Sequence, residues 1–148
     1  MTLTLQEISD RLEIQELLAR YCQAIDGHDW EALDSVFTPA AVIDYSEFGG
    51  PRAELSGIKS FLAEVMPLHS GHYHLVSNVI AEVDGDRATC RSVCNNPMVL
   101  DKGDGRTHVY FCGLWYEDEL VRTDAGWRIS ARREQKCFLW DPEATPRR

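Results

Sequence analysis

The sequence is short of basic residues and of long apolar runs, and each shortage argues against a class of protein. Fifteen Lys and Arg stand against 24 Asp and Glu, giving a formal charge of −9, whereas a nucleic-acid surface needs concentrated positive charge. No apolar run approaches the roughly 20 residues that span a bilayer. No basic segment followed by an apolar stretch opens the chain, so we expect no signal peptide. The expected protein is cytoplasmic, with neither a nucleic-acid nor a membrane partner.

Paired cysteine motifs are also missing. The five cysteines are Cys22, Cys90, Cys94, Cys112 and Cys137. Their number is odd, and no two have the CxxC spacing of zinc ribbons or redox sites. We therefore expect free thiols in a reducing compartment.

What is present indicates one globular domain over residues 1–148. Hydrophobic residues make up 44% of the chain and charged residues 26%, which is ordinary for a folded domain. A chain of this length buries one sizeable core without needing disulfides or a metal.

The first half of the chain predicts helices. Thr4 and Glu7 form a capping-box pattern, followed by apolar residues at helical spacing up to Asp26-Gly27, where glycine favours a left-handed end. Asp29 is expected to cap a second short helix through Phe37, closed by Pro39. A first strand is predicted over 41–48, and Ser56 is expected to cap a third helix through Met66.

The second half predicts antiparallel strands. An Asp84-Gly85 hairpin signal separates a strand ending at Val83 from one over about 88–100. Further strands are expected over 107–121 and from Trp127 to about Trp140. Helices followed by a meander favour an α+β domain. A long antiparallel sheet that curls and is closed by helices encloses a cone-shaped pocket.

Asp26 is an unusual residue for a helix C-terminus. The helix dipole disfavours a carboxylate there, which would raise its pKa. Asp29 is the better cap for the next helix. Asp26 is thus either a turn residue bonded to local backbone or a functional carboxylate.

His72 and His74 lie two residues apart, so on one strand they would share a face. Three interpretations stay open: structural hydrogen bonding, metal ligation, or acid–base chemistry. A metal needs further ligands, and the other histidines show no matching spacing, so no metal is expected. An acid–base histidine needs a partner that fixes its tautomer, and Asp26 is the candidate.

Two other stretches offer polar side chains. Tyr45 is either a core aromatic or a phenol that polarises a substrate carbonyl. From Gly126 onward the residues alternate, so Trp127 and Ile129 are predicted to face opposite to Arg132.

Several segments together resemble the SnoaL-like branch of the NTF2-like superfamily over nearly the whole chain. The matching segments are Tyr21–Asp26, Asp29–Leu33, Phe37-Thr38, Ile43–Tyr45, His74–Asn78, Val83–Asp86 and Gly126–Ile129. The resemblance implies the NTF2-like cone, a curled mixed or antiparallel sheet with N-terminal helices closing the pocket. It is nearest to scytalone dehydratase, bile-acid 7α-dehydratase and hexachlorocyclohexane dehydrochlorinase, lyases with an Asp–His dyad and no cofactor.

The resemblance also implies a site. Asp26 and His74 fall at the positions of the dyad, and Tyr21 and Tyr45 at those of pocket tyrosines, so these four are the predicted catalytic residues. The residues predicted to contact substrate are Asn96, Arg132, His72 and Tyr116. Asn95, Asn96 or Pro97 stands where scytalone dehydratase has a second catalytic histidine. Asn96 is the best match, and an amide does not readily protonate a leaving group. The group that assists departure is therefore unidentified.

The expected function is a cofactor-free lyase, or an isomerase, acting on a small, largely apolar, cyclic substrate. The alternatives are a binding or assembly module like the β subunit of ring-hydroxylating dioxygenases, and a polyketide-type cyclase. A homo-oligomer, dimer or trimer, is expected through the outer sheet face, where Trp115, Phe138 and Trp140 are candidate contacts.

Overall fold

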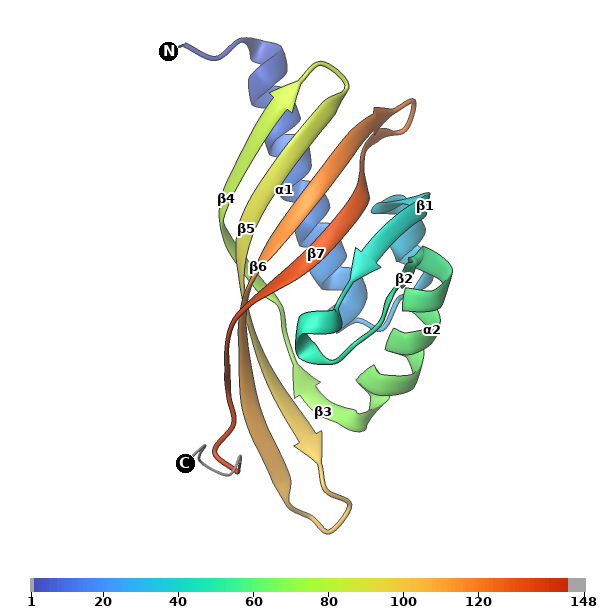
Figure 1. The fold of residues 1–148 in the computed structure, drawn as a ribbon, viewed down its shortest axis with the longest axis vertical. Coiled ribbons are helices and arrows are strands. Elements are labelled where there is room, and N and C mark those ends of the chain that lie inside the picture. Colours follow the sequence, from blue (N-terminus) through green and yellow to red (C-terminus); the bar gives the residue numbers. More distant parts are fainter. Residues whose placement is uncertain (1, 144–148) are drawn as a thin grey trace.

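The computed structural model describes residues 2–143 and confirms the α+β class. Two α-helices and seven strands follow one another in these residues, joined by three short 3₁₀ turns (Figure 1). The elements are α1 (Leu5–Asp26), β1 (Phe37–Asp44), β2 (Arg52–Glu54), α2 (Leu55–Val65), β3 (His69–His72), β4 (Leu75–Asp84), β5 (Arg87–Asp101), β6 (Thr107–Thr123) and β7 (Gly126–Trp140). Neither α-helix is long and apolar enough to cross a membrane.

Helix α1 begins and ends where the sequence predicts, although its end differs in conformation. The Thr4 hydroxyl accepts from the Glu7 N–H and the Glu7 carboxylate accepts from the Thr4 N–H, which completes the capping box. Gly27 keeps a right-handed φ of −88°, and the left-handed residue is His28, with φ 55°. The chain thus turns one residue later than expected.

Three predictions for the next segment are wrong. Asp29 accepts a hydrogen bond from the Ala32 N–H, but the turn that it caps is a 3₁₀ helix over Glu31–Ser35. Strand β1 begins at Phe37 and therefore includes Pro39, which was expected to end a helix. Helix α2 starts at Leu55, so Glu54 rather than Ser56 occupies the N-cap, without a side-chain hydrogen bond.

The seven strands form one curled sheet that is not closed into a barrel. Their order is β2-β1-β7-β6-β5-β3, with β4 also paired to β5, and only the β1–β7 pair is parallel. Helix α1 runs behind the sheet and α2 lies beside β1 and β2 (Figure 1). The core fills the space between α1 and the sheet, with Ile14, Leu17, Trp127 and Ile129 all buried.

Two irregularities decide which side chains face inward. The predicted strand through His72 and His74 is interrupted: β3 ends at His72, and β4 starts at Leu75. In β7, Ile129 pairs with Leu120 and Ala131 with Glu119, so Ser130 is the extra residue of a β-bulge. The bulge reverses the alternation that the sequence predicts and turns Arg132 to the same side as Trp127 and Ile129.

A buried carboxylate holds α1 to the far end of the sheet. Asp10 is 2% exposed and accepts two hydrogen bonds from the Arg122 guanidinium, at 2.8 and 2.9 Å, and one from the Trp127 indole N–H. The Arg122 hydrogen bonds outweigh the effect of burial and lower the pKa of Asp10 to about 2. The charged form is therefore the one that the fold stabilises.

We predict that Asp10→Asn destabilises the protein by about 2 kcal/mol at neutral pH. The folded pKa lies below the unfolded one, so the contribution of Asp10 is present above pH 4–5 and is lost as the pH falls toward about 2. Urea unfolding of both proteins at several pH values should show their difference shrink in that window. Asp86→Asn is the matched control, because Asp86 binds the same Arg122 but its side chain is 83% exposed. A difference that does not change with pH would contradict the assignment.

Candidate active site

Asp26 and His74 lie against each other where α1 ends and the chain passes from β3 to β4. The His74 Nδ1 is 2.7 Å from the Asp26 Oδ1, and the His74 main-chain N–H donates to Oδ2 at 3.1 Å. Both carboxylate oxygens are thus bound by one residue. The contact that the sequence predicted is present. Because the chain is interrupted between β3 and β4, the His74 main-chain N–H is free of the sheet and can donate to Asp26.

The electrostatics of Asp26 run opposite to the effect expected from the helix dipole. Partial burial raises the pKa of this carboxyl, but hydrogen bonds from the His74 side chain and backbone outweigh it and leave the pKa below its ordinary value. Asp26 is therefore ionised at neutral pH. An ionised acceptor at Nδ1 fixes neutral His74 in the Nδ1–H tautomer and leaves Nε2 as a base.

His74 also lines a cavity of about 280 Å³ between the sheet and α2. Its wall is mainly apolar and includes Ile25, Phe61, Leu62, Met66, Met98 and Leu114. This volume lies near the lower end of the range for small-molecule pockets, roughly 300 to 1,000 Å³. Asp26 does not line the cavity; it lies behind His74, in a shallow groove beside α1. The cavity therefore presents the imidazole, not the carboxylate, to a bound molecule.

Tyr21 and Tyr45 form a hydroxyl pair in the same cavity. Their oxygens are 2.8 Å apart, and both residues line the wall. Burial raises the pKa of each phenol above its ordinary value. Both hydroxyls therefore stay protonated, and at least one proton is free to be donated to a guest oxygen.

Arg132 does not line this cavity, contrary to the prediction that it contacts substrate. It is buried and donates two hydrogen bonds to Asp118, at 2.7 and 2.8 Å. Its guanidinium carbon lies 4.1 Å from the Tyr21 ring centre and 4.0 Å from that of Tyr116. Arg132 and Tyr116, which is also absent from the wall, support Tyr21 from behind.

Asn96 lines the cavity, but its amide nitrogen is already engaged. It donates to the Tyr73 carbonyl oxygen at 2.7 Å and so holds the residue before His74 in place. The amide thus positions the corner that carries the imidazole, which is a different role from the predicted contact with a leaving group.

His72 lies outside the cavity wall and approaches the same carboxylate oxygen of Asp26 as His74 does. Its Nδ1 is 3.4 Å from the Asp26 Oδ1, and its Nε2 is 3.0 Å from the Nε2 of His28, whose ring stacks on it. Burial lowers the pKa of His72 and favours the neutral ring. Asp26, His72 and His74 offer three ligand atoms within 4.8 Å of one another, which is the number of protein ligands in many catalytic zinc sites.

One further cavity residue, Glu134, was not indicated by any pattern in the sequence. It lies on β7 after the Ser130 bulge, opposite Tyr116, and its carboxyl contributes to the wall. The strict alternation predicted from the sequence would have placed Arg132 and Glu134 together on the outer face of the sheet. Predicting that Glu134 faces inward would have required knowing that Ser130 forms a bulge.

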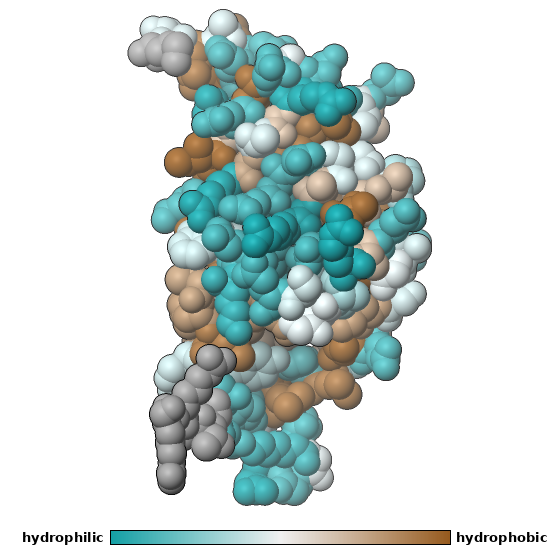
Figure 2. Space-filling view, viewed as in Figure 1, coloured by the Kyte–Doolittle hydropathy of each residue, from teal (hydrophilic) through white to brown (hydrophobic). Residues whose placement is uncertain are grey.

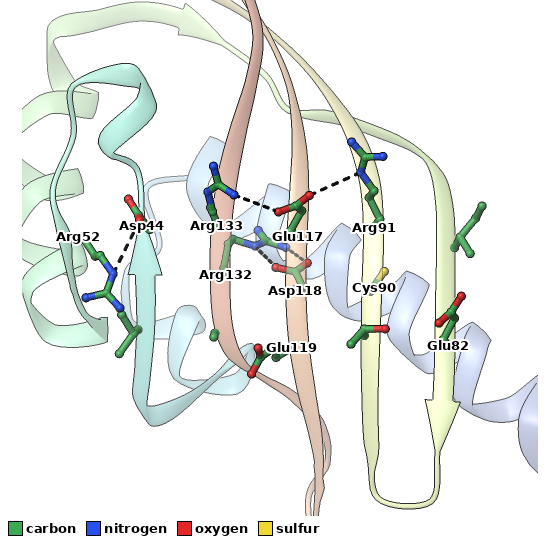
Figure 3. A pocket seen from close by; sticks show the side chains of 14 residues that line it. Asp44, Arg52, Glu82, Cys90, Arg91, Glu117, Asp118, Glu119, Arg132 and Arg133 are labelled. Atoms are coloured by element: carbon green, nitrogen blue, oxygen red, sulfur yellow. Dashed lines mark hydrogen bonds and ion pairs between the residues drawn. The ribbon is translucent and has the colours of Figure 1, made fainter.

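A second hollow, a groove of about 680 Å³, lies on the sheet face turned away from α1. Ion pairs cross it from Arg52 to Asp44, and from both Arg91 and Arg133 to Glu117, at 3.5 to 3.9 Å (Figure 3). Hydrophilic residues cover the middle of this face of the molecule (Figure 2). Most of its arginines are paired with carboxylates in this way. The expected association of copies through this face stays a prediction.

Comparison with known proteins identifies the family. The SnoaL-like domain model matches residues 6–133, and the chain therefore belongs to the SnoaL-like family. An uncharacterized protein of Mycobacterium tuberculosis is 50% identical over 136 residues, which cover 92% of this chain and 91% of that protein.

Solved structures share the fold. A protein of Novosphingobium aromaticivorans, provisionally assigned as an aromatic ring hydroxylase, is 30% identical with a TM-score of 0.81, covering 90% of this chain and 94% of the other. One from the same organism, provisionally assigned as a scytalone dehydratase, has a TM-score of 0.84 at 19% identity, covering 97% and 94%. Hexachlorocyclohexane dehydrochlorinase of Novosphingobium barchaimii has a TM-score of 0.81 at 18% identity, covering 97% of each. They confirm the NTF2-like cone.

We predict that Arg132→Met destabilises the fold by about 3 to 5 kcal/mol, because it leaves the Asp118 carboxylate buried without its partner. The double variant Asp118→Asn/Arg132→Met should recover a large part of that loss. Arg133→Met is the control, since the neighbouring arginine is half exposed. Urea unfolding measures all three. A single variant as stable as the control would show that the buried pair is not needed.

Proposed function

We propose that this protein is a cofactor-free lyase in which His74, oriented by Asp26, removes a proton from carbon. The observation that carries the proposal is the 2.7 Å contact between His74 Nδ1 and Asp26 Oδ1 beside an imidazole that lines a largely apolar cavity. Lyase-type relatives of the same fold, a dehydrochlorinase and a provisional dehydratase, are consistent with it.

The chemistry follows from the wall of the cavity. A small, largely apolar cyclic substrate is expected, because most of the wall is apolar and the volume is small. His74 Nε2 accepts the proton of a carbon next to a carbonyl group, which positioned base catalysis accelerates by about a hundred- to ten-thousand-fold. The Tyr21 and Tyr45 hydroxyls stabilise the developing oxyanion, an interaction worth about 3 kcal/mol for one good donor. Removal of this proton produces an enolate. An isomerase or a polyketide-type cyclase would use the same intermediate.

A binding or assembly module is the rival, and the provisional ring hydroxylase relative is its support. Such a module needs neither an imidazole–carboxylate contact nor a cavity that presents it. Both features are present here, and they favour catalysis.

The test uses a panel of small cyclic β-hydroxy ketones and chlorinated cyclohexanes, with enone absorbance and chloride release as the readouts. We predict that His74→Ala and Asp26→Asn each lower turnover by at least about a hundredfold with the fold intact. His108→Asn is the matched control, since His108 is a buried histidine paired with Asp141 outside the cavity. An active His74→Ala variant would refute the proposal. If the wild type and the variants all gave the same turnover on every compound of the panel, the binding module would be favoured.

A metal test follows from the three clustered ligand atoms. Because Asp26 and the His74 Nδ1 already satisfy each other, we predict that treatment with a chelator leaves turnover unchanged. Added Zn²⁺ should inhibit by competing for the His74 nitrogen and the Asp26 oxygen. Loss of turnover on chelation, restored by Zn²⁺, would instead make the cluster a catalytic metal site.

A further inference from the structure

Among the residues that the structure describes, Glu134 is the one acidic residue in the cavity wall. It makes no hydrogen bond or ion pair with another residue of the described chain, 2–143. The carboxyl shares the cavity with His74, Tyr21 and Tyr45. Glu134 is partly exposed, and a carboxyl without a partner in a largely apolar wall has no structural task that the fold reveals.

The surroundings of Glu134 favour its protonated form. Burial is the largest influence and raises its pKa to about 8, against a smaller lowering effect of Arg132. Asp118 already neutralises that guanidinium through two hydrogen bonds, and Asp44 adds a further upward effect. At neutral pH the side chain thus holds an O–H that is available to a guest molecule.

The other polar groups of the wall are poorly suited to give up a proton. Burial raises the pKa of the Tyr110 phenol to about 12 and that of the Cys112 thiol to about 11. His69 is hydrogen-bonded to Tyr110 at 2.8 Å and lies 3.2 Å from the Val65 carbonyl oxygen through its other nitrogen. The Asn96 amide is engaged with Tyr73. Glu134 is therefore the group best matched to proton donation near neutral pH.

We propose that Glu134 is the general acid that protonates a leaving hydroxyl group, which makes the substrate class a β-hydroxy carbonyl compound. This rests on the proposed function, in which His74 is the base. Glu134 would then be the group that assists departure, which the sequence left unidentified. A site that expels a halide needs no such acid, because a halide leaves without a proton.

The elimination balances without an added reagent. His74 Nε2 takes the proton of the carbon next to the carbonyl, and that C–H electron pair becomes the new C=C bond. The bond from the β-carbon to oxygen breaks with its electron pair on oxygen, which takes the Glu134 proton and leaves as water. Glu134 is then a carboxylate and His74 an imidazolium, and transfer of one proton between them through that water restores both groups.

The experiment compares leaving groups in one ring skeleton. The probes are 3-hydroxycyclohexanone, 3-acetoxycyclohexanone and cyclohexanone, followed by enone absorbance for the first two and by deuterium uptake from D₂O for the third. Acetate leaves without protonation, and deuterium uptake needs only the base. Glu134→Gln keeps the size of the side chain and removes the acid. Glu119→Gln, on the opposite face of the sheet, is the matched control.

We expect Glu134→Gln to slow loss of water by at least about a hundredfold and to leave acetate loss and deuterium uptake close to wild type. His74→Ala should lose all three. If Glu134→Gln slows both eliminations equally, Glu134 is not the acid. If the wild type takes up deuterium and expels acetate but not water, the acid proposal is overturned and the proposed function stands. If the wild type acts on none of the three, both are overturned.

A titration tests the acid without any substrate. In protein labelled with ¹³C at the glutamate carboxyl, the signal absent from Glu134→Gln should titrate several pH units above the exposed glutamates. Titration in the ordinary glutamate range would overturn the proposal, because the group would then be a carboxylate at the pH of the reaction.

Discussion

The buried pair of Arg132 and Asp118 is the interaction on which the site depends. Its guanidinium lies between the rings of Tyr21 on α1 and Tyr116 on β6, and also near Phe37 on β1. One side chain thereby connects the helix to three strands behind the Tyr21 ring. Because a charge at this depth is tolerated only with its partner and hydrogen bonds in place, the geometry of the pair leaves little freedom to the Tyr21 hydroxyl above it.

The second constraint is the double attachment of Asp26 to His74. The carboxylate accepts from both the ring and the main chain of one residue, which fixes the imidazole as well as its backbone. Asn96 holds the preceding residue from β5. The end of α1 and the break between β3 and β4 are thus locked together, so an otherwise irregular corner holds the His74 imidazole in a fixed position.

The sequence predicted the elements better than their irregularities. Periodicity and the Thr4–Glu7 capping box were sufficient for α1, and the hairpin signals placed β4 to β7. Alternation alone put Arg132 on the outer face, because a one-residue bulge at Ser130 has no marker such as glycine. The same bulge hid Glu134. Pro39 misled for a related reason: proline ends helices but is tolerated at strand positions that need no N–H donor.

From residue chemistry alone Asp26 was only a candidate partner for His74, since 48 positions separate the two residues and no local pattern joins them. The family resemblance supplied the reason to place them together. The opposite is true of Glu134, which the resemblance did not suggest and which only the folded sheet brings inward. These two carboxyls differ in what their surroundings do: hydrogen bonds keep Asp26 ionised, while burial keeps Glu134 protonated. The two environments thus suit two tasks: an ionised Asp26 orients the imidazole from outside the cavity, and a protonated Glu134 inside it suits the proposed acid. Burial in the largely apolar wall raises the pKa of Glu134 to about 8, so the same wall that suits the proposed apolar substrate also favours the protonated form of the proposed acid.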